Sequence, residues 1–375
     1  MTTTGTDSRR LRLGTRGSRL ALTQSGQVAD ALMAAGGGGA ATAAGEASEG
    51  SGGLSIDLVT VRTDGDGDRT PLRQLGGVGV FAARLRHALL DGEVDLVVHS
   101  FKDLPTQPVE GLKVICVPAR EDPRDALCAR DSLTLADLPE GARVGTGSPR
   151  RAAQLLAARP DLEVVDLRGN VPTRLARVRG LEAVGVGTDE PVAPSRADAA
   201  GDLDAVVLAL SGLRRLGLEH CASEVLDLET MLPAPAQGAL AVEARAGEDS
   251  AELARAAVAL DDEPTRLAVT AERALMARLG AGCAAPVGAW AHLRGDSQEP
   301  RALVLRAVVT SLDGGQEVGC ELSTELPEAS VGPRTPRDTA AVRAAEALGA
   351  RAAEVLLEDG ADQIVDLHAN KPRRN

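Results

Sequence analysis

The sequence GTGSPRR, at residues 145–151, follows an apolar run and precedes a stretch with helical periodicity. Ser148 is a good helix N-cap and Pro149 suits the first helical position, so the stretch predicts a strand, a turn and a helix. A helix N-terminus offers free N–H groups and a partial positive charge, which favour an anion. Arg150 and Arg151 add planar guanidinium groups that suit carboxylates or phosphates. The stretch therefore predicts an α/β fold with an anion site at the end of a strand.

Three other segments repeat this pattern of apolar run, polar turn and arginine. They are LGTRGS at 13–18, DLRGNVPTR at 166–174 and LSGLRRLG at 210–217. A single arginine in such a place is more often a solvated charge than a ligand contact. Repetition at equivalent places favours binding instead, because ligands of open α/β sheets lie at the carboxyl ends of the strands. The chain therefore predicts a compact pocket for a small polyanion.

Strand-like and helix-like patterns alternate through the first two thirds of the chain, which predicts open parallel sheets covered by helices. We expect strands at 11–15, 56–61, 94–99, 114–118, around Val144, and at 164–167, 205–210 and 239–243, and helices at 18–34, at 80–90, after Ser148 and after Val171.

The pattern changes towards the C-terminus. Residues 231–238 form a Pro-rich connector, and an α+β third domain is expected from Glu263 onwards. Its expected elements are a helix at 264–279, strands at 286–292, 302–311 and 317–323, and a helix at 338–358. Three segments rich in Gly and Ala or in Pro and charge are expected to be flexible surface insertions: 36–53, 184–200 and 325–336.

The composition excludes several classes of function. The 375 residues carry a net charge of −13, and an acidic surface disfavours binding to a phosphate backbone. Phe81, Phe101 and Trp290 are the only Phe, Tyr or Trp residues, so base-stacking platforms are missing. The polar N-terminus and the lack of an apolar run of about 20 residues predict a cytoplasmic protein without a membrane partner. Five cysteines without C-x-x-C spacing, and scattered histidines, predict neither a disulfide framework nor a metal site.

A lysine and an aspartate follow an apolar run in VVHSFKDLP, at residues 97–105. In an arbitrary sequence, Lys102 and Asp103 would most often be a surface ion pair at the end of a strand. The functional interpretation is a carboxylate held in an electropositive site for acid–base or cation-stabilising chemistry. It gains weight because the arginine turns are expected at the same edge of the sheet.

A cysteine lies in the glycine-containing segment AGCAAP, at residues 281–286, just after the helix expected to end near Leu279. A glycine C-cap followed by a small buried cysteine is the ordinary interpretation of this segment. The alternative is an accessible thiol at Cys283 that acts as a nucleophile or as a covalent anchor.

Together these segments resemble the hydroxymethylbilane synthase (porphobilinogen deaminase) family over nearly the whole chain. The matching ranges are 11–24, 63–66, 76–106, 120–126, 145–151, 166–174, 205–218, 235–243 and 271–288. The resemblance implies a transferase that condenses four porphobilinogen molecules into the linear tetrapyrrole 1-hydroxymethylbilane and releases ammonia at each addition. It implies two periplasmic-binding-protein-like (type II) α/β domains with open mixed sheets and a smaller α+β C-terminal domain. The expected boundaries are 1–119 with 238–258, then 124–233, then 262–375, in a monomer.

The resemblance also implies roles for individual residues. Asp103 matches the family's essential aspartate, and Cys283 matches the cysteine that carries a dipyrromethane cofactor through a thioether. The implied cofactor-binding residues are Ser100, Lys102, Thr146, Ser148, Arg150 and Arg151, and the implied substrate-binding residues are Arg16, Ser18, Arg168, Arg174 and Arg215. The family often has a lysine and, a few residues later, an acid where this chain has Val78 and Arg84.

These implied roles agree with the chemistry of the side chains. Each pyrrole carries an acetate and a propionate, so a growing chain accumulates carboxylates that suit arginine. Loss of ammonia from the substrate leaves an azafulvenium-type cation, which a fixed carboxylate at Asp103 stabilises. Lys102 should hold cofactor carboxylates and help to keep Asp103 ionised.

A hypothesis from another class is a non-enzymatic anion-binding protein, such as a solute receptor or an effector-binding regulator. Two lobes and arginine turns fit that hypothesis. It explains neither Asp103 nor a third domain with Cys283, and the missing export signal disfavours a receptor.

Overall fold

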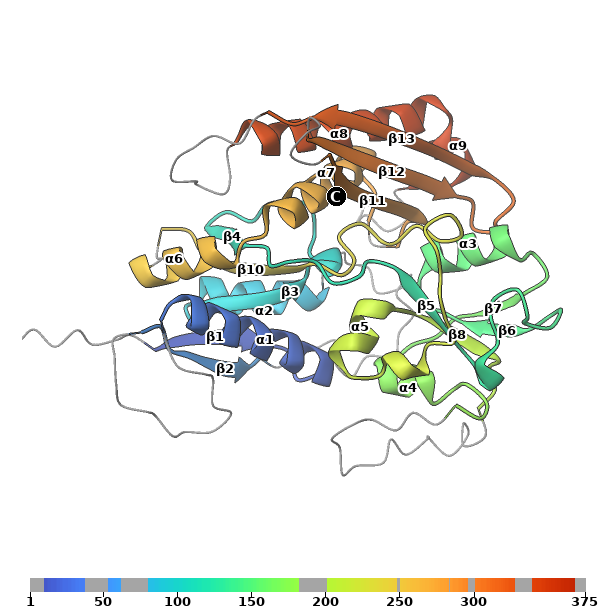
Figure 1. The fold of residues 1–375 in the computed structure, drawn as a ribbon, viewed down its shortest axis with the longest axis horizontal. Coiled ribbons are helices and arrows are strands. Elements are labelled where there is room, and N and C mark those ends of the chain that lie inside the picture. The colour runs from blue at the N-terminus through green and yellow to red at the C-terminus, as the bar shows by residue number, and fades with distance from the viewer. Residues whose placement is uncertain are drawn as a thin grey trace, which may run out of the picture.

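The described part of the chain folds around three separate β-sheets, which lie in the mainly blue and cyan part, the mainly green part and the orange-red part of Figure 1. The computed structural model describes residues 10–37, 53–61, 80–181, 201–247, 250–282, 284–295, 301–327 and 339–367. The predicted insertions lie largely outside these described residues, as does Val78.

The helices and strands alternate in the first two sheets and segregate in the third. The strands are β1 (Leu11–Thr15), β2 (Ile56–Thr60), β3 (Leu96–Ser100), β4 (Leu112–Cys116), β5 (Asp125–Ala129), β6 (Arg143–Gly145), β7 (Glu163–Val165), β8 (Ala205–Ala209), β9 (Glu224–Val225), β10 (Leu240–Arg245), β11 (Val287–Arg294), β12 (Ala302–Thr310) and β13 (Glu317–Glu325). The helices are α1 (Arg19–Ala35), α2 (Val80–Leu90), α3 (Pro149–Ala158), α4 (Val171–Leu175), α5 (Leu210–Arg215), α6 (Ala251–Leu260), α7 (Glu263–Leu279), α8 (Ala340–Glu358) and α9 (Ala361–Ile364).

The first lobe is the sheet β2-β1-β3-β10-β4 with its helices. Strand β1 pairs in parallel with β2 and with β3, whereas β10 runs antiparallel between β3 and β4. Helices α1 and α6 bury one apolar face against this sheet through residues such as Val28 and Leu253. Helix α2 covers the other face with Leu85 and Leu89, which are 3% and 0% exposed. Both faces of the sheet are therefore covered, as an α/β protein requires.

The second lobe repeats this plan with the sheet β7-β6-β8-β5-β9. Strand β6 is parallel to β7 and β8, and β5 is antiparallel to β8 and β9. Two apolar clusters lie on its faces, one around Leu175 and Leu213 and the other around Leu155 and Val207. Leu20 of α1 packs against the first of these clusters, which brings the start of α1 against the second lobe.

Two segments carry the chain between the lobes. The first crossing segment, residues 117–124, joins β4 to β5, and the second crossing segment, residues 226–239, joins β9 to β10. The two segments touch, because the Glu121 N–H donates to the Gly238 carbonyl at 3.3 Å. Gly238 has φ +88°, and a Cβ atom there would collide with the Glu121 carbonyl, so this contact requires glycine.

The predicted fold class is confirmed, with one correction. The alternating pattern predicted parallel sheets, but both sheets are mixed because β5 and β10 run antiparallel to their neighbours. Each of these strands follows a crossing segment. The direction in which a strand runs after such a crossing depends on the tertiary fold, so local periodicity does not reveal it. Strands β5 and β9 and helices α5, α6 and α9 were not predicted. The mixed sheets agree with the two periplasmic-binding-protein-like lobes that the resemblance implies.

The third sheet, β11-β12-β13, is an antiparallel meander with α7 and α8 on one face. Gly349 of α8 lies so close to α7 that a Cβ atom would collide with the Ala271 carbonyl. Helix α7 ends at Gly280, whose φ of 64° forms a left-handed C-cap. Val269 of α7 also joins an apolar cluster with Phe101 and Leu104, so α7 packs directly on the first lobe.

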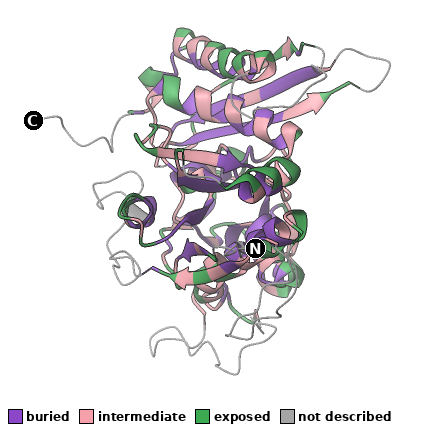
Figure 2. Cartoon of the chain, turned by 90° about the vertical axis from the view of Figure 1, so that its left-hand side faces the viewer, coloured by how far each residue is buried: buried purple, intermediate pink, exposed green. Residues whose placement is uncertain are grey.

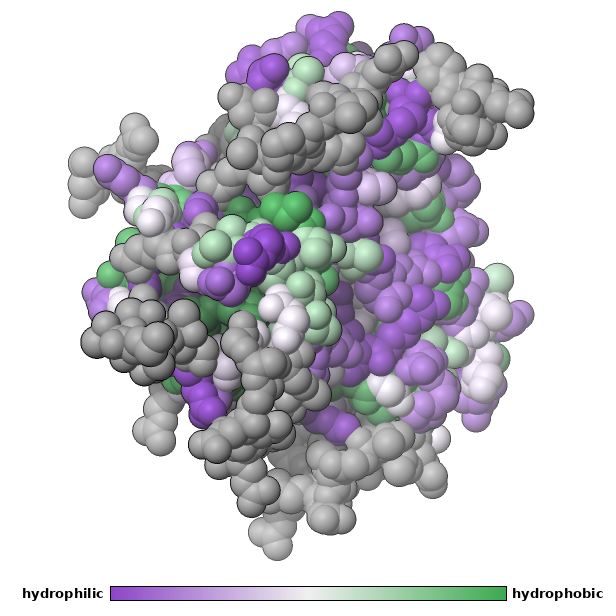
Figure 3. Space-filling view, turned by 60° about the vertical axis from the view of Figure 1, so that its left-hand side comes forward, coloured by the Kyte–Doolittle hydropathy of each residue, from purple (hydrophilic) through white to green (hydrophobic). Residues whose placement is uncertain are grey.

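Burial follows these layers. Figure 2 shows buried residues along the strands and exposed residues on the outer sides of the helices. Figure 3 shows one face, on which hydrophilic residues cover a broad area of the described surface beside a smaller apolar area. None of the helices in the described ranges combines the length and the apolar character that a membrane span needs.

Candidate functional site

The turn after β3 presents Lys102 and Asp103. Strand β3 is buried, and a 3₁₀ turn, Phe101–Asp103, follows it directly. Asp103 is exposed and Lys102 is half-buried. Burial and the positive charge of Arg151 lower the pKa of Lys102 to about 8, although Asp103 and Asp125 oppose that shift. Burial is the larger of the two causes, because it disfavours the charged form of the amine, and the nearby guanidinium of Arg151 adds to it.

Helix α7 holds this turn through Arg273. Its guanidinium donates to the carbonyls of Leu104 and Pro105 at 2.6 and 2.8 Å and of Phe101 at 3.3 Å. It also lies 4.5 Å from the centre of the Phe101 ring, a cation–π distance. The helix that leads to Cys283 therefore fixes the backbone from which Asp103 projects.

The GTGSPRR stretch forms the predicted strand, turn and helix. Ser148 caps α3 by accepting from the Arg151 N–H, and the hydroxyl of buried Thr146 accepts from the Ser148 N–H at 3.2 Å. A Cβ atom at Gly147 would collide with the Leu167 carbonyl, so this tight approach needs glycine. The turn itself is therefore as the sequence predicted.

The two arginines of this stretch point inward onto Asp125. Arg150 Nη2 lies 2.7 Å from Asp125 Oδ2, and Arg151 Nε and Nη2 lie 3.0 and 2.8 Å from Asp125 Oδ1. Arg150 is 3% exposed and Asp125 is 0% exposed. Burial would raise the pKa of Asp125, but the two guanidinium groups hold it well below its usual range. The Nε atom of Arg150 is buried without a hydrogen-bond partner.

The turn at 166–174 places Arg168 and Arg174 in the second lobe. Asn170 caps α4 by accepting from the Thr173 N–H at 2.9 Å. Both arginines are half-buried, and Arg174 Nε donates to the Gly169 carbonyl at 2.7 Å. Burial, Arg151 and Arg168 lower the pKa of Arg174 to about 10, and Asp103 is among the groups that oppose this shift. The carboxylate of Asp103, in the first lobe, is therefore close enough to Arg174, in the second lobe, to raise its pKa.

The remaining predicted residues lie at the start of α1, at the end of β3 and at the end of α5. Ser18 caps α1 by accepting from the Ala21 N–H at 3.3 Å, next to half-buried Arg16. Ser100 donates to the Gln24 side-chain oxygen at 3.2 Å. Arg215 donates to the Gly238 carbonyl at 2.7 Å, and burial lowers its pKa. Arg84, the departure from the family pattern, pairs with exposed Glu93 at 3.0 Å.

Four further residues make tertiary contacts around the arginines, the crossing segments and the turn after β3. Asp125, Gln237, Glu272 and Arg273 were not predicted. Glu272 is 0% exposed and binds Arg120 of the first crossing segment at 2.7 and 3.1 Å. A lone carboxylate inside an apolar stretch, as at Asp125 in DALCA (125–129), was the available signal. Its partners are distant in the chain, so the sequence did not reveal its role.

Cys283 lies outside the described residues, so its predicted role rests on the sequence. The other four cysteines are buried or half-buried. Burial raises the pKa of Cys116 and of Cys128 to about 12, and of Cys320 to about 11. Thiols with such pKa values are poor nucleophiles.

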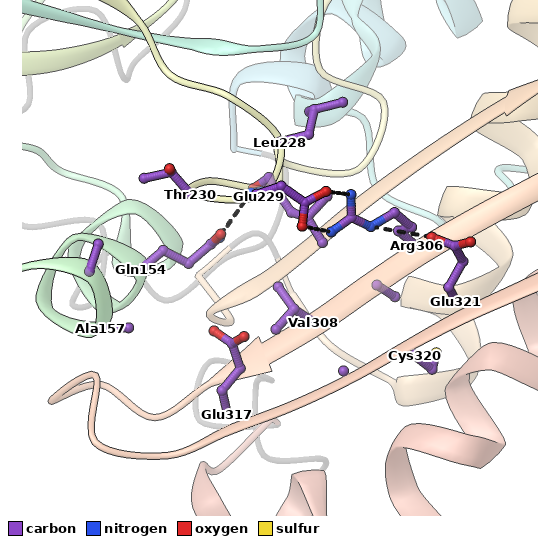
Figure 4. A pocket seen from close by; sticks show the side chains of 14 residues that line it. Gln154, Ala157, Leu228, Glu229, Thr230, Arg306, Val308, Glu317, Cys320 and Glu321 are labelled. Carbon is purple, nitrogen blue, oxygen red and sulfur yellow. Dashed lines mark hydrogen bonds and ion pairs between the residues drawn. The ribbon is translucent and has the colours of Figure 1, made fainter.

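A separate cavity of about 630 Å³ lies between α3, the second crossing segment and the edge of the third sheet (Figure 4). It contains none of the predicted site residues. Arg306 pairs there with Glu229 and Glu321, at 2.5 and 3.5 Å, and a third carboxylate of the wall, Glu317, accepts from the Thr310 hydroxyl at 3.0 Å. We assign this cavity no role.

The two lobes, with their arginine-bearing turns and the exposed Asp103, define a two-lobed α/β protein with an additional C-terminal domain. Two family models match the chain: "Porphobilinogen deaminase, dipyromethane cofactor binding domain" over residues 11–253, and "Porphobilinogen deaminase, C-terminal domain" over residues 266–358. The chain belongs to the porphobilinogen deaminase family, which confirms the resemblance seen in the sequence.

Relatives match over nearly their full length. Porphobilinogen deaminase of Cutibacterium acnes is 50% identical over 366 residues, which cover 97% of this chain and 99% of that protein. Porphobilinogen deaminase of Micrococcus luteus is 50% identical over 376 residues, which cover 94% of each chain. A solved structure of a putative lipoprotein from Ruminococcus gnavus covers 67% of this chain and 90% of that chain, with 12% identity and a TM-score of 0.36. A TM-score this low supports no conclusion about the fold or the function of this chain.

Proposed function

We propose that this chain is a hydroxymethylbilane synthase, a transferase of tetrapyrrole (porphyrin and haem) biosynthesis. It condenses four porphobilinogen molecules stepwise into linear hydroxymethylbilane and releases one ammonia at each addition. The observation that carries this function is the match of both family domains, over residues 11–253 and 266–358, together with relatives that are 50% identical over nearly the whole chain. A binding protein without catalysis would need neither the exposed Asp103 nor the third domain.

The cationic turns fit the dipyrromethane cofactor for which the matching family domain is named. Three cations, Lys102, Arg150 and Arg151, stand against the single buried carboxylate of Asp125. The lowered pKa of Lys102 and the unpartnered Nε of Arg150 both indicate that an added anion would be stabilised here. Ser100, Thr146 and Ser148 complete the proposed set of cofactor-binding residues.

We place the attachment point at Cys283, through a thioether. When bound, the dipyrromethane supplies the pyrrole end to which substrate rings are added. The raised thiol pKa values of the described cysteines support Cys283, because a nucleophilic sulfur must ionise readily. Arg273 supports a functional link between this segment and Asp103, since it joins α7 to the turn that carries Asp103.

Asp103 is the proposed catalytic residue. Its carboxylate is exposed beside Lys102 and within the electrostatic range of Arg174. It would stabilise the cation that porphobilinogen becomes on losing ammonia, and it would manage the proton of the departing amine. Arg16, Ser18, Arg168, Arg174 and Arg215 are the proposed substrate-binding residues, because their positive charges or hydroxyl groups suit the acetate and propionate of porphobilinogen.

The three sheets support the proposed domain boundaries: 1–119 with 238–258, then 124–233, then 262–375. A monomeric state and residence in the cytoplasm stay predictions from the sequence.

An assay of the purified protein with porphobilinogen tests the function. We expect loss of porphobilinogen, release of ammonia in equal amount, and a linear tetrapyrrole that oxidises to a porphyrin. Asp103→Asn is the matched control and should consume little substrate. Binding of porphobilinogen without any release of ammonia would instead identify a receptor or a regulator.

A further inference from the structure

Gln237 lies in the second crossing segment and is 0% exposed. Its side-chain oxygen accepts from Lys102 Nζ at 3.0 Å and from Arg151 Nη2 at 3.4 Å. Its side-chain nitrogen donates to Asp125 Oδ1 and to the Pro123 carbonyl, both at 2.8 Å. Both donor positions and the acceptor oxygen of this one amide are therefore in use.

These four partners come from four parts of the molecule. Lys102 belongs to the turn after β3 in the first lobe, Arg151 to α3 in the second lobe, Asp125 to β5, and Pro123 to the first crossing segment. The orientation of the amide is determined by its neighbours, because the oxygen faces two cations and the nitrogen faces two acceptors. A reversed amide would place like groups against like on both sides.

A neutral amide suits this place better than a charged side chain would. Lys102 faces Asp103 on its own turn, Arg150 and Arg151 on α3, and Asp125 on β5. The Gln237 amide oxygen accepts from the Lys102 ammonium and so offsets the repulsion between Lys102 and the two arginines. Because the amide is neutral, the net positive charge of the group is kept. A carboxylate at the same place would cancel part of the charge that an incoming anion needs.

We propose that Gln237 is a positioning residue that holds the Lys102 ammonium beside Asp103 and ties it to the Asp125–Arg151 pair of the other lobe. This inference rests on the proposed function, in which Lys102 binds carboxylates. Gln237 itself contacts neither Asp103 nor, in our account, the substrate. It acts by fixing the position of the Lys102 ammonium and by favouring its protonated state.

The small number of lysines makes this inference directly measurable. Only Lys102, Lys113 and Lys371 are present, so trace acetylation by acetic anhydride at a series of pH values, read by peptide mass spectrometry, reports each lysine separately. The protein is used as purified, and Lys113 serves as the internal reference. The quantity compared between variants is the pH midpoint of Lys102 acetylation.

Two variants at Gln237 should shift that midpoint in opposite directions. Gln237→Met removes the acceptor, so the Lys102 midpoint should fall by about one pH unit relative to the parent. Gln237→Glu supplies a carboxylate, so the midpoint should rise by about one pH unit or more. Either variant alone decides the question if the other fails to fold, as judged by its thermal unfolding.

Gln154→Met is the matched control. Gln154 is also a buried glutamine, 4% exposed, but its amide exchanges hydrogen bonds only with the backbone of Leu232, at 2.7 and 3.1 Å. Its loss should leave the Lys102 midpoint where it is in the parent. An unchanged midpoint in the folded Gln237 variants would overturn the inference, as would an equal shift in Gln154→Met.

Failure of this inference is distinguishable from failure of the proposed function. A parent protein that does not consume porphobilinogen refutes the function, whatever the acetylation profile. An active parent whose Gln237 variants titrate Lys102 as the parent does refutes only the role of Gln237.

Discussion

At the scale of single residues, the cations of the proposed site outnumber its buried carboxylates. Asp103 is exposed, whereas Asp125 is buried and already shared by Arg150 and Arg151. The sequence predicted which arginines stand at the turns, because N-caps and glycines mark those turns. It did not predict that Arg150 and Arg151 turn inward, because their partner Asp125 comes from a strand about 25 residues earlier whose pairing no local pattern reveals.

Asp103→Asn separates chemistry from binding. The amide keeps the shape of the side chain but removes the charge that should stabilise the substrate cation. General acid–base assistance is typically worth about 10²–10⁴-fold, so the variant should fold and bind porphobilinogen but turn over at least ~100-fold more slowly. Steady-state kinetics measure this directly. Turnover near the parent rate would return Asp103 to the role of an ion-pair partner of Lys102.

The arginine turns should divide into cofactor and substrate roles. Arg150→Leu and Arg151→Leu should each prevent cofactor loading, because the cationic set around Lys102 loses a member and Asp125 loses a buried partner. Arg16→Leu should leave the cofactor in place and impair substrate binding. Intact-protein mass and thermal unfolding of the three variants test this division. Normal loading in both α3 variants would remove that helix start from the cofactor site.

At the scale of elements, α7 links the third domain to the turn that carries Asp103. The periodicity of the sequence predicted α7 to within one residue, with Glu263–Leu279 found against 264–279 expected. Its function as a clamp was not visible, because Glu272 and Arg273 both act on segments more than 150 residues away. Contacts of that range depend on the tertiary fold and not on local propensity.

Replacement of Arg273 tests the clamp. Arg273→Lys keeps the charge but loses the planar fork that binds three carbonyls. We expect turnover to fall roughly ten-fold with a smaller change in KM, since one hydrogen bond to a charged group contributes about 1.5–3 kcal/mol. Arg278→Lys is the control, because Arg278 on the same helix is exposed and pairs with Glu354 at 3.3 Å. Equal losses in both variants would show a general weakening of α7.

A buried ion cluster between α2, β3 and β10 should govern the acid stability of the first lobe. Glu243 accepts from Arg86 at 2.8 Å and lies 3.1 Å from His99 Nε2. Burial alone would raise the pKa of Glu243, but the hydrogen bonds of His99 and Arg86 lower it from 4.5 to about 2. The stabilisation is therefore present above pH 4.5 and is lost as the pH falls towards 2.

Glu243→Gln should remove this dependence. At pH 7 the variant should unfold with a free energy about 3 kcal/mol below that of the parent, and the difference should shrink as the pH falls towards 2. Urea unfolding at several pH values measures it. A difference that stays constant from pH 7 to pH 3 would contradict the role of the ionised carboxylate.

At the scale of the whole molecule, two crossing segments and one helix bring three sheets to a single site. The sequence predicted two α/β lobes and an α+β C-terminal domain, since those follow from alternating and segregated patterns. It predicted parallel sheets where mixed ones occur, because β5 and β10 reach their sheets through the crossing segments. Local patterns likewise did not reveal the contacts of buried Gln237, in the second crossing segment, or of buried Glu272, which lies on α7 and binds Arg120 of the first crossing segment.

The central claim is that the chain builds hydroxymethylbilane on a dipyrromethane held by Cys283, and the intact mass of the purified protein tests it most directly. The account predicts a mass above that of the plain chain by one dipyrromethane unit. Cys283→Ala should abolish this increment, and alanine at Cys116, Cys128, Cys221 or Cys320 should retain it. A protein of plain chain mass that is fully active with porphobilinogen would contradict the account.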